Sequence, residues 1–332
     1  MKRISLFVAV IGTAGLAAGV AGAGRKDVTL SLVAYSTPKA VMAKIISAWQ
    51  QTPAGKGVSF TTSYGPSGDQ AKAVAAGLKA DVVFLSTGDD VNTLVDAGLV
   101  DPNWQKKEAF NGDLAYSVVA FAFRGGNPKH IRTWDDLVKP GVQIVTPNPF
   151  SSGSAKWNVL AAYAAARRAG KTDRQAIAFV TKLFRNVVSQ DSSGRNATNT
   201  FLAGKGDVLL TYESEAVAAK QAGQNLAYLV PNKTMLIELP IAPIKTSPNV
   251  PLVKKFIAFA QGPQAQTILA QNGYRPVLKS VAKQYRAGFP TRALTTISNP
   301  WFVSWRKVDK RWFDPQKGLM VGIEKAVGGP TG

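Results

Sequence analysis

The chain alternates short apolar runs with segments whose apolar residues recur at helical spacing, and each apolar run ends in a turn of small polar residues. Residues 28–35 form a run typical of a buried strand. A turn at residues 36–38 follows, and apolar side chains then recur as on one face of a helix as far as Trp49. This first unit therefore predicts a strand, a turn and a helix.

The same order of elements recurs further along the chain. A strand is expected at residues 58–63, followed by a turn at 64–68 and a helix at about 69–78. A buried strand at 81–85 and a helix at 91–97 come next. Short strands separated by helices indicate a parallel sheet with helices on its faces. The N-terminal part of the chain is therefore predicted to be an α/β unit.

Two longer apolar segments, residues 116–123 and 236–244, interrupt this alternation. Between them lies another series of strand-like and helix-like segments. We interpret it as a second α/β unit inserted in the first, with the two long segments crossing between the units. Lobe 1 is predicted to comprise residues 24–118 together with 238–332, and lobe 2 is predicted to comprise residues 119–237.

The first 23 residues have the pattern of a secretory signal peptide. Lys2 and Arg3 precede an uncharged run at residues 4–20, and an Ala-Gly-Ala sequence at 21–23 fits the cleavage site. A membrane anchor is the competing interpretation, which the small residues and the A-x-A ending disfavour. The chain has no cysteine, which excludes disulfides and a lipid anchor on a first mature cysteine. We expect a soluble mature protein in the periplasm.

The chain carries a large positive charge, with 40 Lys and Arg residues against 20 acidic residues and a net charge of +20. The bases are spread along the whole sequence rather than gathered in blocks. That distribution favours a solvated basic surface over a nucleic-acid footprint, and it also suits the steering of a small anion toward a cleft. No nucleic-acid partner is predicted.

Four strand-to-helix turns carry the residues best suited to chemistry. A helix N-terminus has unpaired N–H groups and about half a positive charge, so it can hold an anion without a cationic side chain. Glycine allows close approach of the backbone, and serine adds a hydroxyl donor. Serine is also an ordinary helix cap, so only the convergence of several turns would make a site. The turns are residues 36–38, 67–68, 151–154 and 192–194.

The sequence around these turns resembles that of the sulfate-binding proteins of ABC importers. The resemblance begins with Tyr64-Gly65-Pro66-Ser67-Gly68-Asp69-Gln70 and continues, in order, at residues 77–83, 126–129, 134–142, 146–149, 152–153, 157–158, 197–201, 206–210 and 274–276. It implies a type II periplasmic-binding fold, in which two α/β lobes joined by two crossing segments hold a dehydrated sulfate with neutral donors. It also implies an ABC permease and ATPase as partners, and we expect a monomer.

Carried over position by position, the ligand donors of the family fall on seven residues of this chain. They are Ser36, Ser67, Ser152, Gly153, Ser154, Gly194 and Tyr212. Four of these depart from the familiar residue: Ser36 stands in place of an Asp, Ser154 and Gly194 in place of a Gly and an Ala, and Tyr212 in place of a Trp. Each replacement keeps a hydrogen-bond donor.

Turns that supply only donors favour sulfate over phosphate. Phosphate keeps a proton near neutral pH and needs an acceptor, whereas a buried carboxylate would repel fully ionised sulfate. Asp69 is the carboxylate that follows the second turn, and we expect it to face solvent, whereas a phosphate site could use it as an acceptor. A receptor for thiosulfate, molybdate or phosphate on the same fold remains an alternative, because the sequence does not give the size of the cavity.

The sequence gives little support to an enzyme. His130 is the one histidine of the chain, and Ser67 does not lie in a G-x-S-x-G motif because Asp69 fills the last position. Carboxylate pairs such as Asp89 and Asp90 have no second histidine or cysteine to complete a metal site. We therefore predict a binding protein without catalysis, cofactor or metal.

The C-terminal segment, residues 301–313, interleaves aromatic and basic residues. Segments that bind nucleic acids or membrane surfaces share this pattern, which leaves open a secreted basic protein that binds anionic polymers or lipid. The spacing of Trp301, Trp305 and Trp312 also fits one apolar face of a helix that docks on a lobe with the bases outward. We favour this second interpretation.

Overall fold

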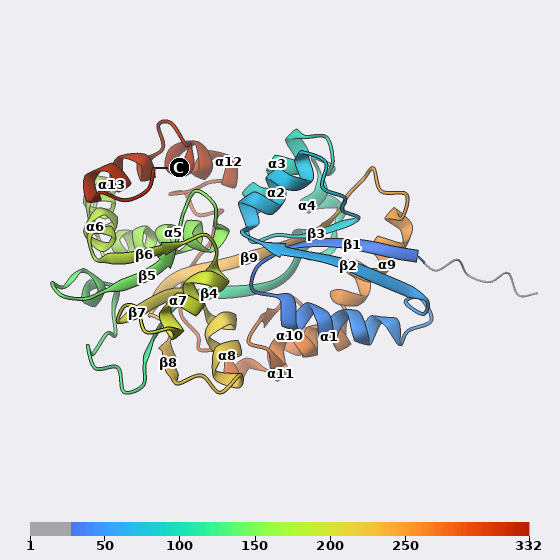
Figure 1. Cartoon of the computed structure of the whole chain (residues 1–332), viewed down its shortest axis with the longest axis horizontal. Helices are drawn as coiled ribbons and strands as arrows, with labels where there is room; N and C mark the ends of the chain where they lie inside the picture. The colour runs from blue at the N-terminus through green and yellow to red at the C-terminus, as the bar shows by residue number, and fades with distance from the viewer. Residues whose placement is uncertain (1–27, 332) are drawn as a thin grey trace, which may run out of the picture.

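The computed structural model describes residues 28–331, in which strands and helices alternate as the sequence predicts (Figure 1). The predicted signal peptide, residues 1–23, lies outside the described residues. The strands are β1 Val28–Tyr35, β2 Val58–Gly65, β3 Val82–Phe84, β4 Asp113–Arg124, β5 Ile144–Pro147, β6 Val187–Asp191, β7 Val208–Tyr212, β8 Leu226–Leu229, β9 Lys233–Pro243, β10 Arg275–Pro276 and β11 Ala293–Thr295.

The α-helices cover both faces of the sheet (Figure 1). They are α1 Lys39–Gln50, α2 Ser67–Ala75, α3 Gly88–Asp96, α4 Trp104–Lys107, α5 Gly153–Arg168, α6 Asp173–Arg185, α7 Gly194–Leu202, α8 Glu213–Gln221, α9 Val250–Ala260, α10 Pro263–Gln271, α11 Lys279–Gln284, α12 Trp305–Val308 and α13 Leu319–Val327. The tighter or wider helical turns are η1 Ala109–Gly112, η2 Trp134–Val138, η3 Arg286–Gly288 and η4 Asp309–Phe313.

The sheet has the order β2-β1-β3-β9-β4-β7-β5-β6. Strands β1, β2 and β3 are parallel to one another, and so are β5, β6 and β7. We call the half built on β1 to β3 lobe 1 and the half built on β5 to β7 lobe 2. The predicted α/β fold with two lobes is confirmed.

Strands β4 and β9 connect the two halves. The first part of β4 pairs antiparallel with β9, and its second part, residues 119–123, pairs with β7 of lobe 2. The last part of β9, residues 241–243, pairs with β3 of lobe 1. These strands contain the first of the two long apolar segments expected to cross between the units, and the second except for Ile244, which follows β9. The exact lobe boundaries, 24–118 with 238–332 and 119–237, stay a prediction.

Helix α5 is enclosed on nearly every side. Trp157 and Tyr163 of this helix are both 0% exposed. The C-terminal segment covers the helix: the Trp305 ring lies 4.8 Å from that of Trp157, and the Trp312 ring lies 4.9 Å from that of Tyr163, both edge to face. A helix surrounded in this way needs small residues between the large ones, which accounts for the many alanines among residues 155–166.

Trp305 and Trp312 lie on one continuous helical run, α12 followed directly by η4, but Trp301 does not, so the prediction of one helix face is wrong for Trp301. Trp301 lies in a turn, and α12 begins only at Trp305 because Ser304 caps it by accepting a hydrogen bond from the N–H of Lys307. Val303, between them, has a φ of 69°, which is incompatible with a helix. Trp305 and Trp312 are nevertheless buried, with the neighbouring Arg and Lys side chains outward.

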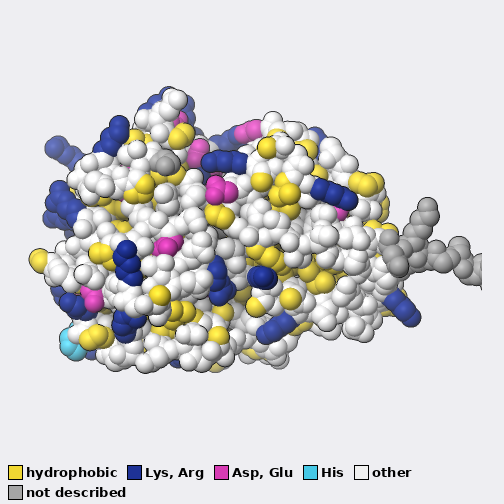
Figure 2. Space-filling model, viewed as in Figure 1, with side chains coloured by type: hydrophobic (Ala, Val, Ile, Leu, Met, Phe, Trp, Pro, Cys, Tyr) yellow, Lys and Arg dark blue, Asp and Glu magenta, His cyan; other side chains and the backbone are white. Residues whose placement is uncertain are grey.

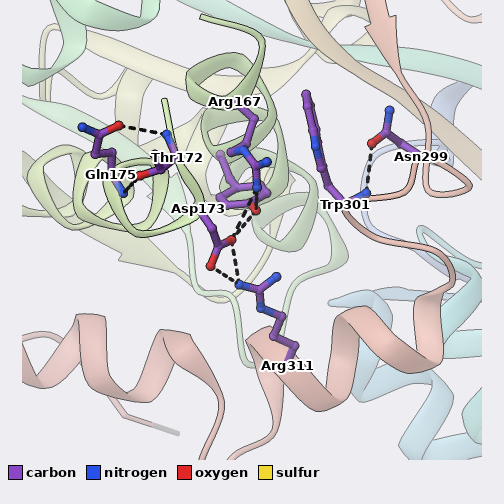
Figure 3. A network of polar contacts seen from close by, with 8 residues as sticks. Arg167, Thr172, Asp173, Gln175, Asn299, Trp301 and Arg311 are labelled. Atoms are coloured by element: carbon purple, nitrogen blue, oxygen red, sulfur yellow. Dashed lines mark hydrogen bonds and ion pairs between the residues drawn. The ribbon is translucent and has the colours of Figure 1, made fainter. Parts of the chain in front are cut away.

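A polar network fastens this segment to lobe 2 (Figure 3). Arg311 donates two hydrogen bonds to Asp173 at 2.7 and 2.8 Å, and the hydroxyl of Tyr163 donates to the same carboxylate at 2.5 Å. Arg167 donates to the Tyr163 hydroxyl at 2.9 Å and lies over the ring of Trp301. The network joins the start of α6 to the end of the chain.

We expect Asp173→Asn to lower the free energy of unfolding by about 1 kcal/mol near pH 7, since the side chains of Asp173 and Arg311 are 45% and 40% exposed and such pairs are worth little. Burial raises the pKa of Asp173, but hydrogen bonds from Tyr163 and Arg311 outweigh it and leave the pKa lowered. The stabilisation is therefore present above the unfolded-state pKa and is lost as the pH falls through the folded-state value.

Urea unfolding of the wild type and of Asp173→Asn at about pH 7 and about pH 3 checks this expectation. The difference between the two proteins should shrink at the lower pH. Asp135→Asn removes an exposed carboxylate outside the network and should stay within about 0.5 kcal/mol of the wild type. A difference that is equal at both pH values would contradict a role for the charge of Asp173.

Basic side chains are spread over the visible face rather than gathered in one patch (Figure 2). This agrees with their distribution along the sequence. Between residues 28 and 331, no helix is long and apolar enough to cross a bilayer.

Candidate anion-binding site between the lobes

The candidate site lies where the turns at the carboxyl ends of the parallel strands of both lobes meet. Lobe 1 contributes the turns after β1, β2 and β3, and lobe 2 contributes those after β5, β6 and β7. A helix begins directly after each of these turns. The carboxyl edge of a parallel sheet is where such folds bind ligands, and here two such edges face each other.

Direct hydrogen bonds join the turns of the two lobes. The N–H of Gly68 donates to the carbonyl of Ser151 at 3.2 Å. The hydroxyls of Ser86 and Tyr212 lie 2.6 Å apart, and the indole N–H of Trp157 donates to the carbonyl of Ser86 at 2.8 Å. The lobes are therefore in contact around the site.

All seven residues predicted as ligands lie in these turns or at the strand and helix ends that adjoin them, and the contacts bring them together. Ser36 accepts a weak hydrogen bond, 3.4 Å long, from the N–H of Arg195, the residue after Gly194. A Cβ built on Gly194 would lie 3.3 Å from the Cβ of Ser154. Ser152 is 3% exposed and precedes Gly153. Their role as ligands stays a prediction.

The two lobes approach each other closely at Gly153. A Cβ on this residue would lie 2.6 Å from Oγ of Ser86 and 2.9 Å from Cγ2 of Thr87, closer than real Cβ atoms come to other atoms. Gly153 is also the first residue of α5, so its N–H has no partner within the helix. Only glycine, which has no Cβ, allows this N–H to lie at the contact between the lobes.

Ser152 caps α5 without using its side chain. The residue is extended, and its hydroxyl makes no capping hydrogen bond. Its N–H donates to the carbonyl of Asn148 at 2.9 Å, and its carbonyl accepts from Ala155 and Lys156. The backbone of Ser152 is thus occupied, and its hydroxyl is the group that this residue can offer an anion.

Ser67 is the first residue of α2, where the sequence predicted a turn and a helix that begins at about residue 69. Its hydroxyl donates to Asp90 at 2.6 Å and accepts from the N–H of Ser86 at 2.8 Å. In this arrangement the hydroxyl is fully engaged. Its N–H, at the first position of a helix, is the donor that remains.

The turn after β3 was missed by the sequence analysis. It consists of Ser86 and Thr87, which are 1% and 0% exposed. Thr87 caps α3 by accepting from the N–H of Asp90 at 3.1 Å. A helix was expected only from residue 91, but α3 begins at Gly88. The Ser-Thr-Gly sequence at 86–88 is typical of a helix N-cap. Placing the start of the helix there would have identified this turn as part of the site.

Tyr212 ends β7 and is 1% exposed. Burial is the main reason that the pKa of its phenol lies far above the usual value, with hydrogen bonding to Ser86 acting in the opposite direction. The phenol therefore stays neutral and can donate a hydrogen bond, as the sequence analysis required of the residue in this position.

Ser154 and Gly194 fit each other. A side chain on Gly194 would meet the Cβ and the Oγ of Ser154, both at 3.3 Å. The extra bulk of Ser154 is therefore accommodated by the missing side chain of Gly194. Two departures from the family pattern that looked independent in the sequence are neighbours in space.

Several charged groups around the site are paired with one another, whereas the buried carboxylate of Asp90 has no ion-pair partner among the described residues. Arg195 lies 3.0 Å from Glu215 and also donates to the carbonyl of Thr37. Burial raises the pKa of Glu215 to about 7, and Arg195 opposes this shift. Lys156 lies 2.5 Å from Asp89, across the seam between the lobes. Asp69 is exposed, as expected.

Two buried hydroxyls beside the site, those of Tyr35 and Thr37, make no well-formed hydrogen bond within the described part of the chain, although they lie near each other and near Tyr274. Buried polar groups normally find partners, and an unpaired one costs about 1–3 kcal/mol. A ligand with several acceptor oxygens would supply the missing partner.

Helix N-termini, serine hydroxyls and neutralised charges together suit a small oxyanion. Within residues 28–331, no group of three or more His, Cys, Asp or Glu residues could hold a metal ion.

Two α/β lobes that face each other across a set of hydrogen-bond donors define the class of two-lobed solute-binding proteins. The chain belongs to the family of bacterial extracellular solute-binding proteins, which it matches over residues 30–275. Its resemblance to sulfate-binding proteins is also confirmed.

Three similar proteins illustrate the match. The chain is 37% identical over 316 residues to the sulfate-binding protein of Synechococcus elongatus, covering 91% of this chain and 90% of that protein. It is 34% identical over 278 residues to the thiosulfate-binding protein of Escherichia coli, covering 80% and 81%. The structure of the sulfate-binding protein SubI from Mycobacterium tuberculosis H37Rv matches with a TM-score of 0.83 and 42% identity, covering 86% of this chain and 100% of that chain.

Proposed function

We propose that this protein is a periplasmic receptor that captures sulfate between its lobes and delivers it to the permease and ATPase of an ABC importer. The convergence of turns from both lobes on one set of neutral donors is the observation that carries the proposal. The sulfate-binding relatives support it. The protein acts as a monomer and has no catalytic activity of its own.

Each of the seven predicted ligand residues has a role in this proposal. Gly153, Ser154 and Gly194 donate through N–H groups at the starts of α5 and α7, and Ser36 and Ser67 donate through their N–H groups in lobe 1. Ser152 and Tyr212 donate through their hydroxyls. Sulfate accepts these hydrogen bonds with all four oxygens and needs no acceptor from the protein. The two lobes must therefore close on the anion together, since both supply donors. Strands β4 and β9, which connect the lobes, provide the hinge.

Isothermal titration of the mature protein tests the proposal. Sulfate is expected to bind with 1:1 stoichiometry and with an affinity that changes little between about 0.02 and about 0.2 M salt, because buried charges are screened much less than exposed ones. Phosphate is expected to bind at least tenfold more weakly, since its proton finds no acceptor among the donors. Molybdate serves as a larger control anion. Binding of phosphate in preference to sulfate would keep the fold and overturn the ligand.

Thiosulfate is the second candidate ligand, and a specific observation favours it: the relative from Escherichia coli that is 34% identical carries that name. The two anions differ by one sulfur atom in place of an oxygen. Competition of thiosulfate against bound sulfate in the same titration separates them. An affinity for thiosulfate above that for sulfate would reassign the receptor to thiosulfate.

A further inference from the structure

A cavity of about 620 Å³ lies outside the anion site, beside the strands that connect the lobes. It is open to solvent on one side and is lined by α3, α4, η1, parts of β4 and β9, residues 297–298, and α12 with the turn before it. Among the residues that line it are Trp104, Trp305, Asp113, Glu238, Lys106 and Arg306. Its volume is within the range of about 300–1,000 Å³ that is typical of small-molecule sites.

Two carboxylates of this cavity have no partner among residues 28–331. Asp113 is 6% exposed, and neither its carboxylate nor that of Glu238 takes part in a hydrogen bond or ion pair with another described residue. Burial, followed by the charge of Glu238, raises the pKa of Asp113 to about 8, and burial also raises the pKa of Glu238. Nearby Tyr116 has its pKa raised to about 12, mainly by burial and then by these two carboxylates.

An unpaired buried carboxylate such as that of Asp113, beside the half-buried Glu238, is unexpected in a chain with twice as many basic as acidic residues. The other buried acids of the described residues each have a partner: Glu213 lies 2.7 Å from Arg275, and Glu215 lies 3.0 Å from Arg195. Asp81, Asp90 and Glu324 have no cation but accept hydrogen bonds from Ser31, Ser67 and Gln190. A buried carboxylate without a cation costs free energy. The carboxylates of Asp113 and Glu238 instead line the cavity, and none of the basic side chains of the described residues is paired with them.

The remaining walls suit a cation with an organic body. Trp104 and Trp305 both line the cavity, and indole rings attract ammonium and guanidinium groups. Arg306, at the rim, is already held by two hydrogen bonds to Asp96, at 2.7 and 3.0 Å. Lys106 is exposed and is the one other base that lines the cavity. Neither base is paired with Asp113 or Glu238, so a cation that pairs with them would come from outside the described part of the chain.

We propose that this cavity is a second binding site, for a small organic cation that carries an ammonium or guanidinium group. The cation pairs with Asp113 and Glu238 and lies against Trp104 and Trp305. A bare divalent metal ion is a poorer fit, because two carboxylates provide few of the six or more oxygen ligands that Mg²⁺ or Ca²⁺ takes, and indole provides none. The inference does not depend on which oxyanion binds between the lobes.

Agmatine, which has a guanidinium at one end and an ammonium at the other, is the probe for this site. Titration of the mature, sulfate-saturated protein with agmatine is expected to show saturable 1:1 binding. The affinity should rise from about pH 7 to about pH 9, because the carboxyl of Asp113 must lose its proton to pair with a cation. Asp113→Asn and Glu238→Gln should each weaken binding at least tenfold, and Lys106→Gln, which removes a repelling charge, should strengthen it.

Two controls are needed. The first shows whether a variant loses agmatine binding through a local effect or through a damaged fold. The second shows whether the site binds a free small cation or an arginine side chain of another protein. Sulfate titration should be unchanged in all three variants, which shows that they fold. A blocked peptide, acetyl-Gly-Arg-Gly-amide, should bind more weakly than agmatine. The proposal is overturned if agmatine does not saturate, if Asp113→Asn and Glu238→Gln leave its affinity unchanged, if the peptide binds more tightly, or if Mg²⁺ binds at these carboxylates in its place.

Discussion

Ser152→Glu is expected to weaken sulfate binding by about 1,000-fold. The hydroxyl of Ser152 is the group that this buried residue can offer the anion, so a carboxylate in its place would face sulfate at short range. Two like charges a few ångströms apart in a buried site cost several kcal/mol, and the carboxyl escapes this cost by taking up a proton. Isothermal titration with sulfate near pH 8 measures the loss.

Ser152→Gln is the matched control, because glutamine has the size of glutamate without its charge. Its effect should be at least tenfold smaller than that of Ser152→Glu. The affinity of Ser152→Glu should also recover as the pH falls from about 8 to about 5, since bound sulfate raises the pKa of the new carboxyl above its usual value of about 4.3. If the two variants are equally impaired and neither responds to pH, size rather than charge explains the loss, and Ser152 does not face the anion.

The order of strands and helices could be predicted from the sequence because each element buries a regular pattern of side chains. β1 was expected at residues 28–35, where the structure has it. Helix starts were less certain, since they depend on capping rather than on periodicity. α2 begins at Ser67 and α3 at Gly88, ahead of the first strongly apolar residue in each case. Because both helices begin earlier than expected, the sequence did not reveal the turn after β3, and Ser67 was assigned to a turn instead of to α2.

The composition of the site was predicted more completely than the roles of its residues. The sequence named turns from both lobes, and the structure brings them together. It could not show that the Ser67 hydroxyl is engaged by Asp90 and Ser86, because that contact joins turns separated by 19 and 23 residues. It also could not show that Ser154 fills the space left by Gly194, which lies 40 positions further on in the chain. Pairings of this kind depend on tertiary structure alone.

The unpaired carboxylates of the second cavity were invisible for the same reason. In the sequence, Asp113 and Glu238 are two ordinary acids among 20. They become neighbours only because β4 and β9 pair antiparallel, with Tyr116 opposite Glu238 and Asp113 opposite Pro240. The crossing strands thus hold the lobes together and bring two distant carboxylates into one cavity.

Gly153→Ala is expected to weaken sulfate binding by about 10- to 100-fold while leaving the protein folded. Its Cβ would lie 2.6 and 2.8 Å from Oγ and Cβ of Ser86, so the serine cannot avoid it by rotating its hydroxyl alone. The lobes must move apart by some tenths of an ångström, and this strain of about 1–3 kcal/mol opposes closure around the anion. Titration with sulfate measures the loss, and small-angle X-ray scattering with and without sulfate should show incomplete compaction.

Gly194→Ala adds the same methyl group at the other glycine of the site, where the nearest atoms lie 3.3 Å away in the Ser154 side chain. That contact is tight but can relax, so the affinity for sulfate should change by less than about threefold. The contrast between the two variants tests the geometry of closure, because both add one Cβ at the first residue of a helix. Equal effects on sulfate binding would mean that the contact between Gly153 and Ser86 does not limit closure.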